Sequence, residues 1–332
     1  MRKKNKAQVI IITLWIMIIL GLLAISVANR VSLGLRLSRY ARDGIKADAL
    51  AMAGINRAVA EIANDTNLYD ALSEPWANDE TKFKEIKADE NNDNEVFSVV
   101  YNKTDLNGKT SPVYGISDED SKININAADE DLVRILLEEF DIAEAGTLAR
   151  NIVAWRGDSN IPVDDPSRDY SLKNYSCKDK PFSNKEELLL VKDITTGTYD
   201  MIKDYITTDT DPSQIRVNIN TASLETLSIL IKYEILSNSL GDSAAGERLL
   251  SSIISQRNLA PFETLADVEF KLDLPNKTEE YNVFNYLQTV VDVQSQYFRI
   301  ISTGIIKKPF LARSSGCVYD NASGKIASWH QN

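Results

Sequence analysis

Hydrophobic and polar positions change character at a few points along the chain, and these changes outline its architecture. Residues 7–29 contain no ionisable side chain. From Arg30 to Asn64 there is no proline, and apolar residues recur near helical spacing. The pattern predicts a single helix over about residues 8–63, apolar all round at first and amphipathic afterwards. Two helices that meet at a bend near Asn29 or Gly34 are the alternative.

The uncharged run is long enough to cross a bilayer. At 1.5 Å per residue, about 20 helical residues span the roughly 30 Å hydrocarbon core. We therefore predict a transmembrane segment over residues 8–29. A cleaved secretory signal ending at Ser26-Val27-Ala28 is the alternative, although its apolar part would exceed the usual length of about 7–15 residues. Basic residues flank the run on both sides, so charge does not fix its orientation.

Strand-like segments form two groups that lie far apart in the sequence. They are rich in β-branched and aromatic residues, are separated by turn signals, and cover residues 95–102, 111–126, 296–306, 310–320 and 325–331. The residues between the two groups have a helical pattern. The order predicts an α+β fold in which a pilin-like antiparallel body, residues 30–125 plus 296–332, is interrupted by an all-α insertion over residues 126–295.

The predicted insertion repeats itself. The segment ININ-AAD at 123–129 returns as VNIN-TAS at 217–223, and each is followed by an apolar helical stretch. A second helix then ends as IVAWR or IISQR, and Pro-Phe opens a further helix in each copy. Four similar elements in the same order indicate a duplication, with subdomains over about 126–210 and 217–290. The Asn, Thr and Ser oxygens of each copy are predicted to cap the following helix.

Segments of this type are typical of helix-hairpin-helix modules, which makes DNA binding an alternative function. A DNA-binding hairpin needs a glycine-rich turn whose amides approach a phosphate, with basic side chains nearby. Residues 118–144 instead hold ten acidic side chains against Lys122 and Arg134. Such a face repels DNA, so we predict a structural role for both copies. Filter binding of duplex DNA at low salt distinguishes the two functions.

The two copies differ most in one loop. Three residues separate Arg257 from Pro261 in the second copy, whereas 24 separate Arg156 from Pro181 in the first. The longer loop supplies oxygen donors of the kind that calcium prefers, namely Asp158, Asn160, Asp164, Asp165 and Asp169. A standard EF-hand register fails, because a proline and a valine occupy its fifth and sixth positions. From the residues alone, a solvated acidic loop and a calcium site are both open.

Composition narrows the classes of function. The chain has 332 residues, with 48 acidic and 37 basic side chains and a net charge of −11, a balance opposite to that of most polyanion-binding proteins. The single histidine is His330, and the two cysteines are Cys177 and Cys317. These counts argue against a histidine-based catalytic site, a thiolate zinc site and a disulfide scaffold. No phosphate-binding loop is recognisable, so we predict a protein that is not an enzyme.

The short basic leader followed by a long, half-exposed helix resembles the type IV pilin and pseudopilin class. In that class a prepilin peptidase cuts after a small residue, usually glycine, that precedes the apolar run. The resemblance places the cut between Ala7 and Gln8, with residues 1–7 as the leader. Losing the four basic residues of the leader would shift the net charge from −11 to −15. Most members carry glutamate five residues into the mature chain, where this chain has Ile12.

The ordered set of motifs is similar to that of one member of the class, the K-type minor pseudopilin of the type II secretion system (general secretion pathway protein K family). The motifs are ISDEDSKININAA, IVAWR, PFSNKEELLLVKDIT, VNINTAS, QYFRIISTG and the terminal region around Trp329. That member typically lacks the glutamate and combines a pilin-like body with a helical insertion of helix-hairpin-helix (SAM-like) character. The resemblance also implies that the helical domain binds calcium, which points to the longer loop between Arg156 and Pro181, the acidic loop, as the site.

The resemblance implies a non-enzymatic function. The chain would form the tip of the type II secretion pseudopilus, assemble with the I-type and J-type minor pseudopilins, and support protein export across the outer membrane. It would be a single-pass inner-membrane protein with a large periplasmic domain, processed by the prepilin peptidase and without a nucleic-acid partner. A membrane-tethered helix-hairpin-helix DNA-binding protein and a minor pilin of a type IV pilus are the alternatives.

Overall fold

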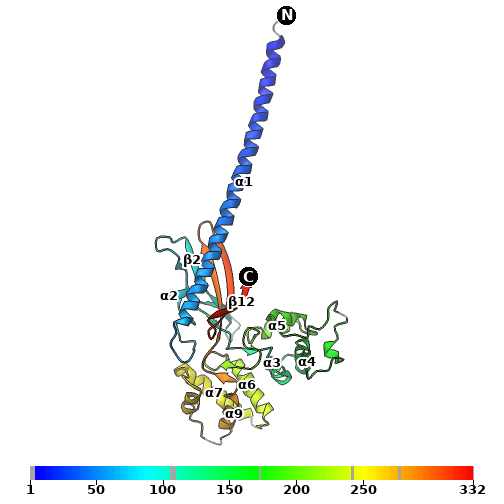
Figure 1. Cartoon of the computed structure of the whole chain (residues 1–332), viewed down its shortest axis with the longest axis vertical. Coiled ribbons are helices and arrows are strands. Elements are labelled where there is room, and N and C mark those ends of the chain that lie inside the picture. The colour runs from blue at the N-terminus through cyan, green and yellow to red at the C-terminus, as the bar shows by residue number, and fades with distance from the viewer. Residues whose placement is uncertain (1–3, 105–109, 172, 241–242, 276–277, 332) are drawn as a thin grey trace.

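The chain begins with one long helix that projects from a compact body. The computed structural model describes residues 4–104, 110–171, 173–240, 243–275 and 278–331. Helix α1 (Lys4–Ala63) is continuous through Asn29 and Gly34, which confirms the single helix; its 60 residues extend about 90 Å at 1.5 Å per residue. The N-terminus lies at one end of the molecule and the helical insertion at the other (Figure 1).

An antiparallel sheet packs against the C-terminal half of α1. The sheet order is β1-β2-β10-β11-β12, and β5 also pairs with β10. Its strands are β1 (Ile86–Lys87), β2 (Glu95–Val99), β5 (Ser117–Asp118), β10 (Tyr297–Ile306), β11 (Leu311–Asp320) and β12 (Lys325–Gln331). A separate hairpin and a short helix complete the body, namely β3 (Tyr101–Thr104), β4 (Thr110–Val113) and α2 (Glu80–Phe83). Because β10 pairs with both β2 and β11, the two distant strand groups form one sheet, as expected.

Helix α1 and strand β10 approach each other closely at two glycines. A Cβ atom on Gly304 would lie 2.0 Å from the carbonyl oxygen of Ala47, and one on Gly54 would lie 2.1 Å from Oγ of Ser302. Larger residues at these positions would therefore force the helix off the sheet. The core of the body consists of Ile55, Ala58, Ile62, Trp76, Ala77, Phe83, Val99, Ile116, Phe298, Ile300, Cys317 and Tyr319, and a smaller apolar cluster contains Ala47, Leu50, Phe97 and Ile306.

The insertion is helical and has a hydrophobic core of its own, separate from that of the body. Its helices are α3 (Glu130–Glu139), α4 (Ala145–Trp155), η1 (Pro166–Arg168), η2 (Lys185–Leu190), α5 (Thr196–Ile202), α6 (Leu224–Ser237), α7 (Ser243–Leu259), α8 (Leu265–Lys271) and α9 (Glu279–Leu287). Two short parallel ladders bracket them, the first between β6 (Ile123–Asn124) and β7 (Ile206–Thr207), the second between β8 (Val217–Asn218) and β9 (Val291–Asp292). We call the segments that these ladders enclose the first copy and the second copy.

The two copies share an internal bonding scheme that matches the sequence repeat. In the first copy, the side chain of Asn126 accepts from the amide of Phe182 (2.8 Å) and donates to its carbonyl (3.0 Å). Asn220 makes the same pair of bonds with Phe262 in the second copy, at 2.9 Å each. Each asparagine thus fastens the start of its copy to the Pro-Phe segment that the sequence places after the second helix. The insertion is therefore a duplicated unit.

Three local expectations differ from the structure. Ser223 caps α6, which confirms the predicted serine cap, but Asp129 caps α3, and the asparagines of the repeat bond to their own turns and to the Pro-Phe segments instead of the helix amides. The Pro-Phe segment of the first copy leads into a 3₁₀ helix, η2, and not an α-helix. The predicted strands over 95–102 and 111–126 are each divided, the latter into β4, β5 and β6. The second division accommodates three buried acids. The domain boundaries drawn from the sequence stay a prediction.

Candidate functional site

The first part of α1 exposes apolar side chains all around the helix. The large hydrophobic side chains between Val9 and Val27 are 50 to 72% exposed. The most apolar 18-residue window of α1 has a mean hydropathy of 2.9 and no part of it is buried. Such a surface is unfavourable in water, because each apolar area left in contact with solvent loses its transfer free energy. By length and composition α1 is able to cross a membrane as a single pass.

The apolar surface of α1 continues past the first charged residue. Val31, Leu33, Leu35, Leu37 and Tyr40 are each more than half exposed, although they lie beyond Arg30. Burial of α1 against the sheet begins only at Asp43, and Ala47 is the first buried hydrophobic residue of the helix. Between the uncharged run and the body, a stretch of helix is therefore uncovered, and it is available for contact with other helices.

The predicted processing bond lies near the N-terminal end of α1. Ala7 and Gln8 both belong to the helix, which begins at Lys4. The first amides of a helix have no intrahelical partner, so this end opens more readily than the rest. Unwinding of about the first turn of α1 would expose the bond between Ala7 and Gln8 to a peptidase. Cleavage between Ala7 and Gln8 stays a prediction.

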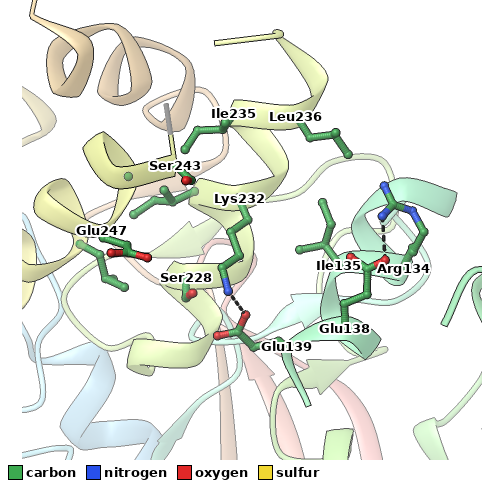
Figure 2. Close-up of a pocket in the computed structure, with 13 residues that line it drawn as sticks. Arg134, Ile135, Glu138, Glu139, Ser228, Lys232, Ile235, Leu236, Ser243 and Glu247 are labelled. Carbon is green, nitrogen blue, oxygen red and sulfur yellow. Dashed lines mark hydrogen bonds and ion pairs between the residues drawn. The ribbon is translucent and has the colours of Figure 1, made fainter. Parts of the chain in front are cut away.

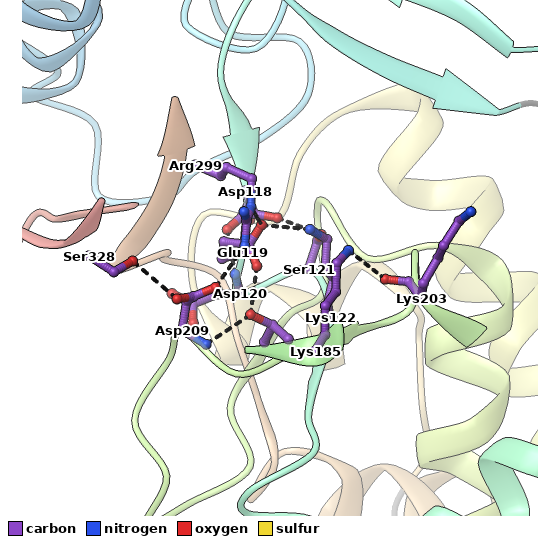
Figure 3. Close-up of polar contacts among 11 residues, drawn as sticks. Asp118, Glu119, Asp120, Ser121, Lys122, Lys185, Lys203, Asp209, Arg299 and Ser328 are labelled. Atoms are coloured by element: carbon purple, nitrogen blue, oxygen red, sulfur yellow. Dashed lines mark hydrogen bonds and ion pairs between the residues drawn. The ribbon is translucent and has the colours of Figure 1, made fainter. Parts of the chain in front are cut away.

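Three consecutive acids join the body to the insertion; we call Asp118, Glu119 and Asp120 the acidic junction. Glu119 is fully buried and accepts from Nε of Arg299 (2.6 Å) and from Nζ of Lys122 (2.6 Å). Its other oxygen accepts from the hydroxyl of Thr207 on β7 (2.6 Å). Arg299 lies on β10, so one carboxylate connects the central strand of the sheet to the closing strand of the first copy (Figure 3).

Asp118 connects the body to the second copy in a similar way, but its hydrogen-bond donors are neutral hydroxyl groups. Its Oδ2 accepts from the hydroxyls of Thr221 (2.5 Å) and Ser295 (2.6 Å). The side chain of Asn218 in turn donates to Ser295 (2.7 Å) and to the carbonyl of Asp70 (3.0 Å). Both copies are thus held to the body by buried hydrogen bonds, which are directional and fix the relative orientation of the two parts.

The acidic junction contains carboxyl groups with opposite proton affinities. Burial alone would raise the pKa of Glu119, but the charges of Arg299 and Lys122 outweigh it and hold this pKa well below its ordinary value. Burial raises the pKa of Asp118 to about 6 and, with the charge of Asp118, that of Asp120 to about 7. Burial also raises the pKa of the neighbouring Asp70 to about 7. Near neutral pH the junction therefore holds a firmly ionised pair beside carboxyl groups that titrate.

Three of the five predicted calcium ligands are already engaged by protein donors. Asp165 caps η1 through the amide of Ser167 (2.9 Å) and accepts from Arg150 (2.7 Å). The carboxylate of Asp158 accepts from the amide of Asn160 (2.9 Å) and lies 3.6 Å from Arg156. Asp169 accepts from the amide of Ser171 (2.9 Å), and Asp164 is exposed.

This arrangement does not fit calcium as it stands. Calcium needs six to eight oxygen ligands around one point. Among the residues that the structure describes, the one group of at least three carboxylates or similar ligands whose donor atoms lie within 4.8 Å of one another is elsewhere, at Asp65, Asp70 and Glu74. That group is largely satisfied by protein donors such as the amide of Ser295 and the indole of Trp76. Calcium binding by the acidic loop stays a prediction from the resemblance.

The turn of the first copy that corresponds to a DNA-binding hairpin is acidic in the structure as well. It connects α3 to α4, and its amide at Ile142 donates to the carbonyl of Leu137 (3.1 Å). Asp141 and Glu144 adopt left-handed backbone conformations (φ of 53° and 58°) at positions where a DNA-binding hairpin would have glycine. Carboxylates at this turn oppose a phosphate instead of attracting one.

An apolar groove of about 360 Å³ lies between α3, α6 and α7 (Figure 2). Its apolar lining consists of Ile135, Ile231, Ile235, Leu236 and Leu250. The cations at its edge are neutralised, because Lys232 pairs with Glu139 (2.5 Å) and Arg134 with Glu138 (2.8 Å). The groove therefore offers mainly apolar contact, with the carboxylate of Glu247 also in its lining.

The two cysteines are free thiols in different surroundings. Cys317 on β11 is fully buried, and burial raises the pKa of its thiol to about 11. Cys177 is half-buried in the loop of the first copy and donates to the carbonyl of Ala154 (3.4 Å). A buried thiol with a raised pKa is a poor nucleophile, because the thiolate is the reactive form.

The chain matches a known protein by its structure and not by its sequence. No protein-family model matches the chain, and no curated protein matches it. Among solved structures, it is similar to a chain of the crystal structure of the GspK–GspI–GspJ complex from the type 2 secretion system of enterotoxigenic Escherichia coli. The TM-score is 0.64 at 15% sequence identity, over 89% of this chain and 99% of that chain. The chain therefore has the α+β fold of a GspK-like pseudopilin, as the sequence resemblance implies.

Proposed function

We propose that this protein is a K-type minor pseudopilin at the tip of a type II secretion pseudopilus. In this role it supports pseudopilus assembly and protein export across the outer membrane, and it has no enzymatic activity. The single observation that carries the proposal is the likeness to a chain of the GspK–GspI–GspJ complex along almost its full length. A likeness confined to the pilin-like body would be expected of any pilin; this one extends to the insertion as well.

The shape of the molecule supports a position at the tip. The insertion lies at the end of the body opposite to the N-terminus (Figure 1). A further subunit stacked beyond the body would meet the insertion, whereas the uncovered part of α1 points away from it. Because Ile12 is uncharged, α1 lacks the group that would pair with the amino terminus of a neighbouring subunit, and it is also less costly to hold in lipid. Both features suit a subunit that ends a filament.

The partners that we propose are the I-type and J-type minor pseudopilins. The similar chain was crystallised in a complex with proteins named GspI and GspJ. In this chain, the surface suited to helix–helix contact is the exposed part of α1 from Val31 to Tyr40, which combines five large hydrophobic side chains with Arg36 and Arg39. Both partners would bring a corresponding helix, and packing of apolar helices side by side is the contact that this stretch favours.

We further propose that the protein is a single-pass inner-membrane protein with a periplasmic body. The prepilin peptidase would cut between Ala7 and Gln8 on the cytoplasmic side. The mass of the mature chain purified from membranes tests this directly. A chain that begins at Gln8 supports a pseudopilin, one that begins at Asn29 indicates an exported soluble protein, and one that begins at Met1 indicates a plain membrane anchor.

Deletion of the gene separates the candidate functions. We expect loss of export through the type II pathway, with pilus-dependent surface motility unchanged; the reverse result would assign the protein to a type IV pilus. Filter binding of duplex DNA at low salt tests the remaining alternative. Tight, salt-sensitive binding would contradict our proposal, since binding of that kind arises from phosphates neutralised by basic groups.

A further inference from the structure

The loop of the first copy leaves and returns to the helical core at one narrow point. We call residues 157–180 the acidic loop, and Gly157 with Asp179 its neck. The amide of Asp179 donates to the carbonyl of Trp155 (3.0 Å), at the end of α4. A Cβ atom on Gly157, whose φ is 84°, would lie 2.9 Å from the carbonyl carbon and oxygen of Asp179. The two ends of the loop are therefore in direct contact.

One side chain from the middle of the loop reaches back to both ends. Arg168 is the last residue of η1, and its side chain is 12% exposed. Its Nη2 donates to the carbonyl oxygens of Asp158 (2.7 Å) and Ile161 (3.1 Å) at the start of the loop. Its Nη1 donates to the carboxylate of Asp179 at the end. The guanidinium thus joins three points of the loop that are up to 21 residues apart (158 to 179).

The oxygens around Arg168 are of the kind that a calcium ion takes. Calcium binds carboxylates together with backbone carbonyls. An arginine satisfies a similar set, because its guanidinium is always charged and presents five N–H donors in a planar fork. It differs from a metal ion in being covalently attached, so the loop does not have to recruit it from solution.

Two further arginines pair with carboxylates of the acidic loop. Arg150 on α4 donates to Asp165 through Nε (3.2 Å) and Nη2 (2.7 Å). Arg156 donates to the carbonyl of Ile125 (2.6 Å) and lies 3.6 Å from the carboxylate of Asp158. Asp158 and Asp165, two of the predicted ligands, are therefore already compensated by protein cations.

We propose that Arg168 is the resident cation of the acidic loop and stands where a divalent cation would otherwise be required. The loop is then held in its folded form by the chain itself and does not depend on calcium. The set Asp158, Asn160, Asp164, Asp165 and Asp169 is accordingly not a calcium site in this protein. The proposal concerns the folding of one loop and is independent of the proposed role in secretion.

Hydrogen exchange of the full-length protein in detergent micelles tests the role of Arg168. We expect Arg168→Gln to speed exchange of amides in residues 157–171 by about tenfold or more, because the contacts of the guanidinium with Asp158, Ile161 and Asp179 are lost and the loop opens more often. The matched control is Arg134→Gln, which removes an arginine bonded to two carboxylates on the surface of α3 and should leave the loop unchanged. Unchanged exchange in residues 297–320 would show that the variant is folded. Exchange of the loop within about twofold of the wild-type rate would overturn the proposal.

A conservative variant and a calcium titration complete the test. Arg168→Lys keeps the charge without the fork and should exchange more slowly than Arg168→Gln; equal rates would show that the charge has no part and would count against the proposal. The melting temperature of the wild-type protein should agree within about 1 °C between about 5 mM calcium and a chelator. A rise of several degrees with calcium would show a native-state metal site and would overturn it.

Discussion

The two copies of the insertion have the same internal scheme but are attached to the body in different ways. Both fasten an asparagine to a distant phenylalanine, and both use an arginine to bind carbonyls at the start of the copy. The first copy is joined to the body through an ion-pair network of Glu119, Arg299 and Asp209. The second is joined through hydroxyls and an amide around Asp118. Duplication thus preserved the interior of the unit, whereas the attachment differs with the place of each copy.

The arginines at the ends of the second helices show the same contrast. Arg257 donates to the carbonyls of Ile219 (2.8 Å) and Ala222 (2.7 Å), and burial lowers its pKa to about 10. Arg156 contacts one carbonyl and also the carboxylate of Asp158, which belongs to the acidic loop. The longer loop of the first copy therefore adds charge pairs to a scheme that works without them in the second.

The largest effect is expected from breaking the attachment of the first copy. Arg299→Met leaves the fully buried Glu119 with Lys122 as its cation partner, and loss of one partner from a buried ion pair costs about 3–5 kcal/mol. Urea unfolding of the full-length protein in detergent measures the change in the free energy of unfolding. Arg134→Met, at an exposed pair on α3, is the control and should cost less than about 1 kcal/mol. Equal losses in the two variants would refute a special role of the junction.

The next effect compares the shared asparagines directly. Asn220→Ala removes two bonds to the fully buried Phe262 and should cost about 2 kcal/mol. Asn126→Ala removes the same bonds at a half-buried position and should cost about 1 kcal/mol, since water can partly replace the lost partner. Differential scanning calorimetry under matched conditions ranks the two. A larger loss for Asn126→Ala would contradict the ranking by burial.

Two carboxyl groups of the acidic junction, Asp120 and Glu119, should also respond to pH in opposite directions. The pKa of Asp120 is raised to about 7, so its contribution to stability is present at low pH and is lost as pH rises through that value. The pKa of Glu119 is lowered, so its contribution is lost only in acid. Asp120→Asn keeps an acceptor for the amides of Gln296 and Tyr297 and should weaken the decline of the melting temperature between about pH 4 and pH 7. An unchanged pH profile would exclude Asp120 as the titrating group.

The smallest effect belongs to a contact present in the first copy alone. Arg150→Gln removes the pair with Asp165, but the arginine side chain is 40% exposed, so the expected loss of stability is much smaller than that of Arg299→Met. A thermal melt measures it. A loss as large as that of Arg299→Met would mean that the acidic loop, and not the junction, carries the attachment of the first copy.

Local patterns in the sequence predict most of the helices and strands correctly, but they do not predict the acidic junction. The uncharged run, the helical spacing up to Asn64 and the two strand groups predict α1 and the sheet, because each signal lies within one element. From the sequence alone, the acidic residues at 118–120 are interpreted as part of a surface that repels DNA. Their partners in the fold are distant in the sequence: Arg299, which pairs with Glu119, is 180 residues away. A signal was nevertheless present, since three acids between two isoleucines stand where the insertion begins.

The acidic loop illustrates a different limit. Its composition gives the number of oxygen donors, and a resemblance suggests an ion, but composition does not say which donors are already bound by the protein. Arg168 was visible in the sequence beside Asp169, and its contact with the carbonyls of Asp158 and Ile161 follows only from the fold of the loop. Carbonyl oxygens are supplied by every residue, so no pattern of residue types marks them.

Assembly with the other minor pseudopilins tests the central claim most directly. The full-length chain would be co-expressed with the I-type and J-type proteins of the same secretion system and purified in detergent through a tag on this chain. We predict one complex that contains all three proteins in equal amounts, by size-exclusion chromatography with light scattering. Elution of this chain alone, under conditions in which the I-type and J-type proteins still bind each other, would contradict the account.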